Sequence, residues 1–281
     1  MLCVRSVPGW SLVAAVVLAG CKSDRASTAA VSEPAAVTIT AKDYSFDAPA
    51  RLPAGATTMH LVNQGKELHH AQLVRLEDGK TMEDLAQVLK NPGPPPSWIK
   101  FVGGPNAVAP GGKANATSVL EPGRYAYLCF VFGPDGVIHA AKGMMQPFEV
   151  TGEVTAAKAE LPAAEVTIKM ADYTFEPTKP LTPGRHTIRV ENAGPQPHEL
   201  ALLKLAPGKN VEDFALWAEG GMKGPPPAEP IGGIVFLDQG GSGTFTADLT
   251  AGDYGLICFV PDAKDGKPHL AHGMMKTIKV G

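Results

Sequence analysis

Hydrophobic and polar residues alternate over short stretches of this chain, and turn-forming residues separate most of these stretches. Segments 37–40, 59–62, 71–75 and 125–131 show the alternation, with β-branched or aromatic residues on one face. Most of them are bounded by Gly, Pro or Asn, which favour turns. Many short strands at this spacing predict an all-β fold of the sandwich type.

The pattern occurs twice along the chain, 129 positions apart. Beyond Cys129 and its counterpart Cys258 the offset becomes 130, because the loop that follows the cysteine is one residue longer in the second copy. The duplication predicts two tandem domains, 37–150 and 166–281, joined by an Ala- and Glu-rich linker at 151–165. The landmarks that repeat include Val37-Thr38-Ile39 with Val166-Thr167-Ile168, Asp43-Tyr44 with Asp172-Tyr173, Asn63 with Asn192, Gly103-Gly104 with Gly232-Gly233, and Cys129-Phe130 with Cys258-Phe259.

One interruption of the strand pattern also repeats. Residues 81–90 and 210–219 have a helical distribution of apolar residues, and each is followed by a proline-rich loop, at 94–96 and 225–227. Each predicted sandwich should therefore carry a short helical insert.

The first residues do not fit the strand pattern. Arg5 supplies a positive charge, and a short apolar run follows that closes with Leu18-Ala19-Gly20-Cys21. This order resembles a bacterial lipoprotein signal, which implies a signal at 1–20, a lipid on Cys21 and a flexible tether at 21–36. A plain secretory cleavage site with an incidental cysteine is the alternative. We expect a protein held at a membrane of the bacterial cell envelope by its lipid and facing the periplasm.

Composition argues against nucleic acid as a partner and limits which cysteines are available for disulfides or metal binding. The 281 residues carry a net charge of −3 with 44% hydrophobic residues, so the chain is of ordinary globular composition and nucleic acid is an unlikely partner. With Cys3 removed and Cys21 carrying lipid, only Cys129 and Cys258 remain. They occupy equivalent positions of two domains, so we expect no disulfide between them.

Two histidines, one cysteine and one methionine keep the same order in both copies. Two imidazoles, a thiolate and a weak thioether suit a trigonal copper site with a long axial bond. The sulfur ligands favour Cu(I) and imidazole also accepts Cu(II), so a rigid β-scaffold around this set suits electron transfer. The candidate ligands are His69, Cys129, His139 and Met144 in the first copy, and His198, Cys258, His269 and Met274 in the second.

The order of these residues resembles that of the cupredoxins, the blue copper proteins such as plastocyanin and azurin. The shared features are an early histidine after an Asn-x-Gly turn, a Tyr-rich strand that ends in cysteine, and a later histidine followed by Gly-Met. The resemblance covers nearly the whole chain after the signal, twice. It implies two tandem Greek-key β-sandwiches with up to one copper ion each, Cu(I) or Cu(II), and a periplasmic redox partner protein. It also implies that the methionines are the axial ligands.

One feature departs from plastocyanin and azurin. Their Cys-to-His loop is very short, whereas here it spans ten positions in the first copy and eleven in the second. Two-domain copper nitrite reductases resemble this chain in having a long loop at their blue copper site. The residues also have structural interpretations, since a cysteine on a sandwich strand and a Gly-Met-Met run are both common in cores.

Residues next to the candidate ligands are expected to play structural roles. Tyr125 and Tyr254 precede the cysteines by four positions and are expected to form tyrosine corners. The second methionine of each Gly-Met-Met should face away from the first, since neighbours on a strand point to opposite sides. His70 and His272 have no histidine counterpart in the other copy, so we interpret them as surface or supporting residues.

Four functions follow from this sequence. The leading one is an electron-transfer or copper-binding lipoprotein; copper storage or delivery in the periplasm and a metal-free interaction module are alternatives. An oxidase or nitrite reductase would need a further copper, often bound by a histidine directly before the cysteine, where this chain has Leu128 and Ile257. The sequence therefore predicts a copper binder or electron carrier that is not an enzyme.

Overall fold

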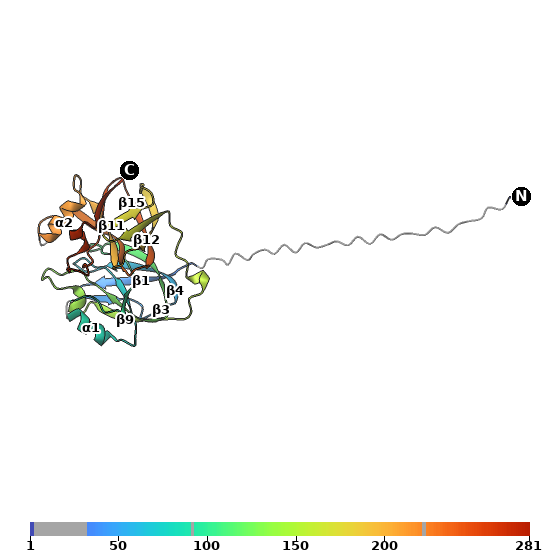
Figure 1. Cartoon of the computed structure of the whole chain (residues 1–281), viewed down its shortest axis with the longest axis horizontal. Coiled ribbons are helices and arrows are strands. Elements are labelled where there is room, and N and C mark those ends of the chain that lie inside the picture. Colours follow the sequence, from blue (N-terminus) through green and yellow to red (C-terminus); the bar gives the residue numbers. More distant parts are fainter. Residues whose placement is uncertain (3–32, 91–92, 221–222) are drawn as a thin grey trace. The chain divides into compact units, whose positions relative to one another are not determined.

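The computed structural model describes residues 1–2, 33–90, 93–220 and 223–281. Cys21 and most of the predicted signal and tether lie outside the described residues. Within the described ranges, no helix is both long and apolar enough to cross a membrane. Figure 1 colours the chain along its sequence, with the first copy of the repeat in blue to green and the second in yellow to red.

The two copies contain matching series of strands with one helix each. The first comprises β1 (Ala35–Lys42), β2 (Ser45–Asp47), β3 (Arg51–Pro53), β4 (Gly55–Asn63), β5 (Gln72–Leu76), α1 (Met82–Lys90), β6 (Ile99–Phe101), β7 (Lys113–Leu120), β8 (Gly123–Leu128), η1 (His139–Lys142) and β9 (Met145–Thr151). A short 3-10 turn, η2 (Ala156–Lys158), follows. The second comprises β10 (Val166–Ala171), β11 (Thr174–Pro177), β12 (Gly184–Asn192), β13 (His198–Leu205), α2 (Val211–Glu219), β14 (Ala228–Leu237), β15 (Ser242–Leu249), β16 (Gly252–Ile257), η3 (His269–His272) and β17 (Met275–Val280).

Each copy folds into two packed sheets. In the first, β7-β4-β1-β2 faces β3-β9-β8-β5-β6; in the second, β11-β10-β12-β15 faces β14-β13-β16-β17. Alternate residues of facing strands fill a core in each copy, such as Leu61 of β4 with Leu73 of β5 and Val190 of β12 with Leu202 of β13. The prediction of an all-β fold built from β-sandwiches is confirmed.

The helical inserts form where the pattern predicts them, and local side chains cap them. The Asn210 side chain accepts from the Asp213 amide while the Asp213 carboxylate accepts from the Asn210 amide, which is a complete capping box. Thr81 and Asp84 make the same reciprocal pair at the start of α1. Leu85 is the buried residue of α1 and packs against the outer side of the β5–β8 sheet.

The two sandwiches are joined along two lines, so the described residues from 33 to 281 belong to one compact unit. Strands β7 and β15 pair at Thr117 and Thr244. This pairing joins the sheet β7-β4-β1-β2 of the first copy and the sheet β11-β10-β12-β15 of the second into one eight-stranded sheet. Segment 101–108 lies against β14 of the second copy: the Gly103 N–H donates to the Phe236 carbonyl at 2.9 Å, and the Asn106 N–H donates to the Gly233 carbonyl at 3.1 Å.

Both predicted tyrosine corners are present. The Tyr125 hydroxyl donates to the Glu121 carbonyl at 2.8 Å, and the Tyr254 hydroxyl donates to the Thr250 carbonyl at 3.1 Å. Both rings are almost fully buried. These bonds fix the strand that leads to each cysteine.

Two glycines allow a close backbone approach beside the strand that follows each early histidine. Gly104 has φ +132° and Gly233 has φ +111°, values that side chains rarely allow. A Cβ at Gly104 would overlap the Ala71 carbonyl oxygen, and one at Gly233 would overlap the Leu200 carbonyl oxygen. The paired glycines that repeat in the sequence therefore hold the interface segments against the site-bearing strands.

We expect Gly233→Ala to lower the free energy of unfolding by about 2–5 kcal/mol, because left-handed strain adds to the overlap with the Leu200 carbonyl. Urea denaturation measures this. Gly208→Ala is the matched control, since Gly208 has φ +75° and no atom within 4 Å of the added Cβ, and it should cost about 1–2 kcal/mol. Equal losses in the two variants would contradict the close approach.

Candidate metal centre

The long loop between Cys129 and His139 folds back on itself as a narrow hairpin. The His139 N–H donates to the Val131 carbonyl at 2.9 Å, and the Gly133 N–H donates to the Val137 carbonyl at 2.9 Å. In the second copy the His269 N–H donates to the Val260 carbonyl, also at 2.9 Å. Because the added residues lie in the hairpin, the extra loop length does not move the histidine away from the cysteine.

Backbone bonds tie the cysteine, the late histidine and the methionine together. The Cys129 N–H donates to the Met144 carbonyl at 3.3 Å, and the Met144 N–H donates to the His139 carbonyl at 2.9 Å. Gly143 caps the end of the turn η1 with φ +101°, and this left-handed conformation returns the chain toward the cysteine. The second copy repeats these bonds among Cys258, His269 and Met274, at 3.1 and 3.0 Å.

The early histidine is placed by the Asn-x-Gly turn that precedes it. The Asn63 side chain donates to the Glu67 carbonyl at 2.8 Å and to the Val108 carbonyl at 2.9 Å, and it accepts from the Gly65 amide at 2.9 Å. Backbone bonds between His69 and Val108 then hold the histidine at the edge of the core. Asn192 makes the corresponding contacts with Gln196, Leu237 and Gly194 in the second copy.

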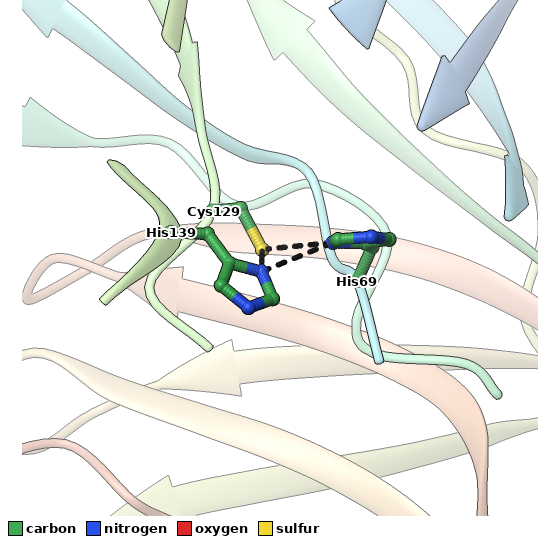
Figure 2. Close-up of side chains that lie close together, drawn as sticks. All are labelled: His69, Cys129 and His139. Atoms are coloured by element: carbon green, nitrogen blue, oxygen red, sulfur yellow. Dashed lines mark hydrogen bonds between the residues drawn. The ribbon is translucent and has the colours of Figure 1, made fainter. Parts of the chain in front are cut away.

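Three donor atoms converge in the first copy. The Nδ1 atoms of His69 and His139 lie 3.1 Å apart, and the Cys129 Sγ lies 3.8 Å from the first and 3.5 Å from the second. Figure 2 shows the two rings and the thiol turned toward one another. All three side chains are fully buried.

The second copy reproduces the arrangement. The Nδ1 atoms of His198 and His269 lie 3.0 Å apart, and the Cys258 Sγ lies 3.4 Å from the His269 Nδ1. One donor atom from each of the three residues falls within 4.8 Å of the others, and all three residues are buried. Both cysteines are free, as expected.

Each methionine lies in the core cluster that holds its cysteine. Met144 shares a cluster with Cys129, and Met274 shares one with Cys258; both are fully buried. The neighbouring Met145 packs in the cluster beneath α1, on the other side of the sheet. The expected alternation of the two methionines is therefore observed, and the structure brings the two histidines and the cysteine of each copy together, while the methionine as a fourth ligand stays a prediction.

The outer nitrogens of the histidine rings face carboxylates. His69 Nε2 lies 3.3 Å from Asp43 Oδ1, and His139 Nε2 lies 2.8 Å from Glu67 Oε2. In the second copy His198 Nε2 lies 2.8 Å from Asp172 Oδ1. Because an ionised carboxylate only accepts hydrogen bonds, these contacts place the ring proton on Nε2 and leave the Nδ1 lone pair facing the cysteine.

Burial favours the neutral form of His69, His198 and His269. Desolvation lowers the pKa of His69 and of His198, although Asp43 and Asp172 act in the opposite direction. Desolvation and the nearby His198 lower the pKa of His269 to about 4. Neutral imidazole is the form that binds metals.

The donor set fits a metal ion on electrostatic grounds. Two Nδ1 lone pairs at 3.0–3.1 Å repel each other unless a proton or a cation lies between them. Burial raises the pKa of the Cys129 thiol to about 12, so only a cation among these atoms would make the thiolate stable at neutral pH. Two imidazole nitrogens and one sulfur in a closed apolar shell suit copper better than a hard, oxygen-seeking ion.

A tyrosine that no sequence motif singled out packs against the late histidine in each copy. The Tyr44 ring meets the His139 ring edge-on at 5.3 Å, and its hydroxyl donates to Glu67 at 3.0 Å. Tyr173 meets His269 at 5.5 Å, and its hydroxyl donates to Asp262 at 2.5 Å. Both tyrosines have positive φ, 63° and 75°, which is uncommon for a bulky residue and indicates that their neighbours hold them there.

The sequence contained part of this information. Asp43-Tyr44 and Asp172-Tyr173 repeat at the same offset as the candidate ligands, so their preservation was a usable signal. The carboxylate near the late histidine was not recognisable, because Glu67 supplies it in one copy and Asp262, from the Cys-to-His loop, supplies it in the other.

The residue that directly follows each early histidine accepts a hydrogen bond from the amide of the residue after the cysteine. His70 is buried, and its Nε2 accepts from the Phe130 amide at 2.7 Å. Glu199 occupies the same place in the second copy and accepts from the Phe259 amide at 3.0 Å. His70 is thus a supporting residue, whereas His272 is partly exposed and contacts Asp265 at 3.2 Å.

The chain is similar to known proteins at the level of solved structures. The sequence matches no protein-family model and no curated protein. Reduced auracyanin from Roseiflexus castenholzii is 20% identical over 42% of this chain and 97% of its own, with a TM-score of 0.31. A blue copper oxidase from Nitrosomonas europaea is 16% identical over 88% of this chain and 86% of its own, with a TM-score of 0.27. A copper nitrite reductase from Nitrosomonas europaea is 17% identical over 88% and 93%, with a TM-score of 0.25.

One expectation is corrected by these comparisons. The sequence predicted a protein that is not an enzyme, whereas the structures similar over 88% of the chain are an oxidase and a nitrite reductase. The prediction rested on Leu128 and Ile257, which occupy the positions before the cysteines. Two positions are too few to exclude catalysis, because a further metal can be held by residues elsewhere on a fold.

His70 should make the metal-free protein less stable as the pH falls. Burial lowers its pKa from 6.5 to about 3. Between these values the unfolded chain binds one more proton at this residue than the folded chain does. The free energy of unfolding should therefore fall by about 1.4 kcal/mol per pH unit on acidification below about pH 6.5 on account of His70.

Urea denaturation of wild type and His70→Gln at pH 6.5, 5.5 and 4.5 measures this contribution. The wild type should lose stability more steeply than the variant by that slope, while His60→Gln, at an exposed position, should keep the wild-type slope. Parallel curves for wild type and His70→Gln would show that His70 is not held neutral.

Proposed function

We propose that this chain is a copper-binding protein with two type 1-like centres that carries electrons in the periplasm. The observation that carries the proposal is the convergence, in each copy, of two histidine Nδ1 atoms and one cysteine Sγ in a fully buried group. His69, Cys129, His139 and Met144 would hold one ion, and the matching residues of the second copy the other. Copper would supply the one-electron couple between Cu(I) and Cu(II).

The residues of the chain would keep the geometry unchanged between the two oxidation states. Backbone bonds fix the cysteine to the methionine and the late histidine, and carboxylates fix the ring orientation of His69, His139 and His198. Neither strand nor loop can move a ligand without breaking several buried hydrogen bonds. A centre that relaxes little on gaining or losing an electron exchanges electrons readily.

The proposal extends to the location of the protein. The sequence around Cys21 supports a lipid anchor at a membrane of the bacterial cell envelope, with the two sandwiches facing the periplasm. The tether at 21–36 would give the sandwiches reach toward a redox partner protein.

Replacing either cysteine tests the copper centres. We expect Cys129→Ser to remove about one copper equivalent and leave the other centre's visible absorption, and Cys258→Ser to do the converse, because the thiolate supplies both charge and softness. Copper content and the thiolate-to-copper absorption of each purified variant measure this. Met145→Leu is the control, since that side chain faces away from the site, and it should retain both equivalents.

The outcomes of that titration separate the candidate functions. Two equivalents with a strong thiolate-to-copper band support electron transfer, and a weak band supports storage or delivery. If neither cysteine variant changes the copper content, the cysteines are core residues and the proposal is wrong.

The lipid anchor has its own test. Cys21→Ser should move the protein from the membrane fraction to the soluble fraction, since the acyl chains on that cysteine would be what holds it. Fractionation followed by immunodetection measures the distribution. An unchanged distribution contradicts the anchor, and it leaves the copper proposal unaffected.

A further inference from the structure

Asn106 of the first copy lies at the interface between the two sandwiches, and its side chain points into the second. Asn106 is 2% exposed. Its Nδ2 donates to the Glu199 Oε2 at 2.9 Å and to the Leu200 and Ile234 carbonyls at 3.2 Å each. Its Oδ1 accepts from the Ala107 amide at 2.7 Å, which sets the direction of the Nδ2.

Glu199 connects Asn106 to the second group of candidate ligands. It directly follows His198 and is buried. Its backbone N–H points at the Cys258 Sγ at 3.5 Å, and its Oε1 accepts from the Phe259 amide, next to the cysteine, at 3.0 Å. The two carboxylate oxygens thus join the residue after Cys258 to a side chain of the other sandwich.

Among the described residues, the first group has no such hydrogen-bonded bridge: the residue after Cys129 meets the second copy through ring stacking alone, with the ring centroids of Phe130 and Phe236 at 5.5 Å. There His70 accepts from the Phe130 amide at 2.7 Å, and both residues belong to the first copy. The residue 129 positions after Asn106 is Val235, which has no side-chain donor to offer in the opposite direction. The bridge between the copies therefore runs one way.

We propose that Asn106 is a positioning residue of the second centre, acting through Glu199 on the segment around Cys258. The second centre is then positioned in part by a hydrogen-bonding side chain of the other copy, whereas the hydrogen bond to the residue after Cys129 comes from the first copy itself. This inference rests on the proposed function for its copper readout, and it has a second readout that needs no metal. Losing the Nδ2 donor frees the Glu199 side chain to move, and with it the Phe259 amide next to Cys258 that this side chain holds.

The copper experiment uses the whole chain with one centre at a time. In the Cys129→Ser background, Asn106→Ala should change the ratio of oxidised to reduced second centre about tenfold at fixed potential, which is a midpoint shift of about 59 mV for one electron. In the Cys258→Ser background the same substitution should leave the midpoint of the first centre in place. Asn115→Ala is the matched control, because Asn115 also crosses the interface, to Thr246, but does not reach Glu199.

A double-mutant cycle with Glu199→Gln shows whether Asn106 acts through Glu199. If it does, Asn106→Ala should add little to the shift that Glu199→Gln produces alone. An unmoved second centre, or a shift of the first centre as large as that of the second, overturns the proposal.

The metal-free experiment follows amide hydrogen exchange by NMR. Asn106→Ala should speed exchange of the Phe259 amide about tenfold, because its acceptor Glu199 loses its fixed position, and should leave the Phe130 amide unchanged. If the cysteine variants bind no copper but Phe259 exchange responds in this way, the proposed function fails and the positioning role stands. Unchanged Phe259 exchange overturns the positioning role whether or not copper binds.

Discussion

Two imidazoles and a thiol buried within 4.8 Å of one another cost free energy for each ring nitrogen that faces away from the group without a partner. Avoiding this cost accounts for much of the structure around each group. Asp43 and Asp172 lie opposite the early histidines at 3.3 and 2.8 Å. The strained tyrosines beside the late histidines keep a carboxylate in place through their hydroxyls. Once the outer nitrogens are fixed, the inner lone pairs have no orientation left except toward the sulfur.

The first copy gives both outer ring nitrogens a carboxylate partner, whereas the second copy does so only for its early histidine. Glu67 lies 2.8 Å from His139 Nε2 in the first copy. In the second copy Gln196 stands at the Glu67 position and bonds Asp262, which lies 3.7 Å from His269 Nε2. His269 Nε2 is left without a hydrogen bond among the described residues. A ring that donates to a carboxylate is the more basic ligand, so the first copy supplies a stronger late imidazole than the second.

The scaffold tolerates long loops because the ends of each loop are fixed by backbone pairing. A backbone hydrogen bond joins Cys129 to Met144, and another joins Cys258 to Met274. The length of the hairpin between the cysteine and the histidine therefore does not determine where these residues lie. The paired glycines bring segments 101–108 and 228–237 against the strands that follow the early histidines. This close approach also brings Asn106 within reach of Glu199, so the packing of the sandwiches and the environment of the second group share one cause.

The sequence alone was sufficient for the duplication, the strand pattern, the two helical inserts and the His-Cys-His trio of each copy. Each of these is encoded locally or by exact repetition: alternation marks the strands, Asn210 and Asp213 mark a helix start, and the 129-residue offset pairs His69 with His198. The tyrosine corners and the opposite orientation of the paired methionines also follow from local spacing.

The tertiary structure alone decided which carboxylates face the rings, which side chain crosses between the sandwiches, and how the copies differ. Glu67 contacts a histidine 72 residues away, and Asn106 contacts a glutamate 93 residues away. Neither contact leaves a period or a motif, because it depends on how strands distant in sequence pack and not on the order of residues within any one of them.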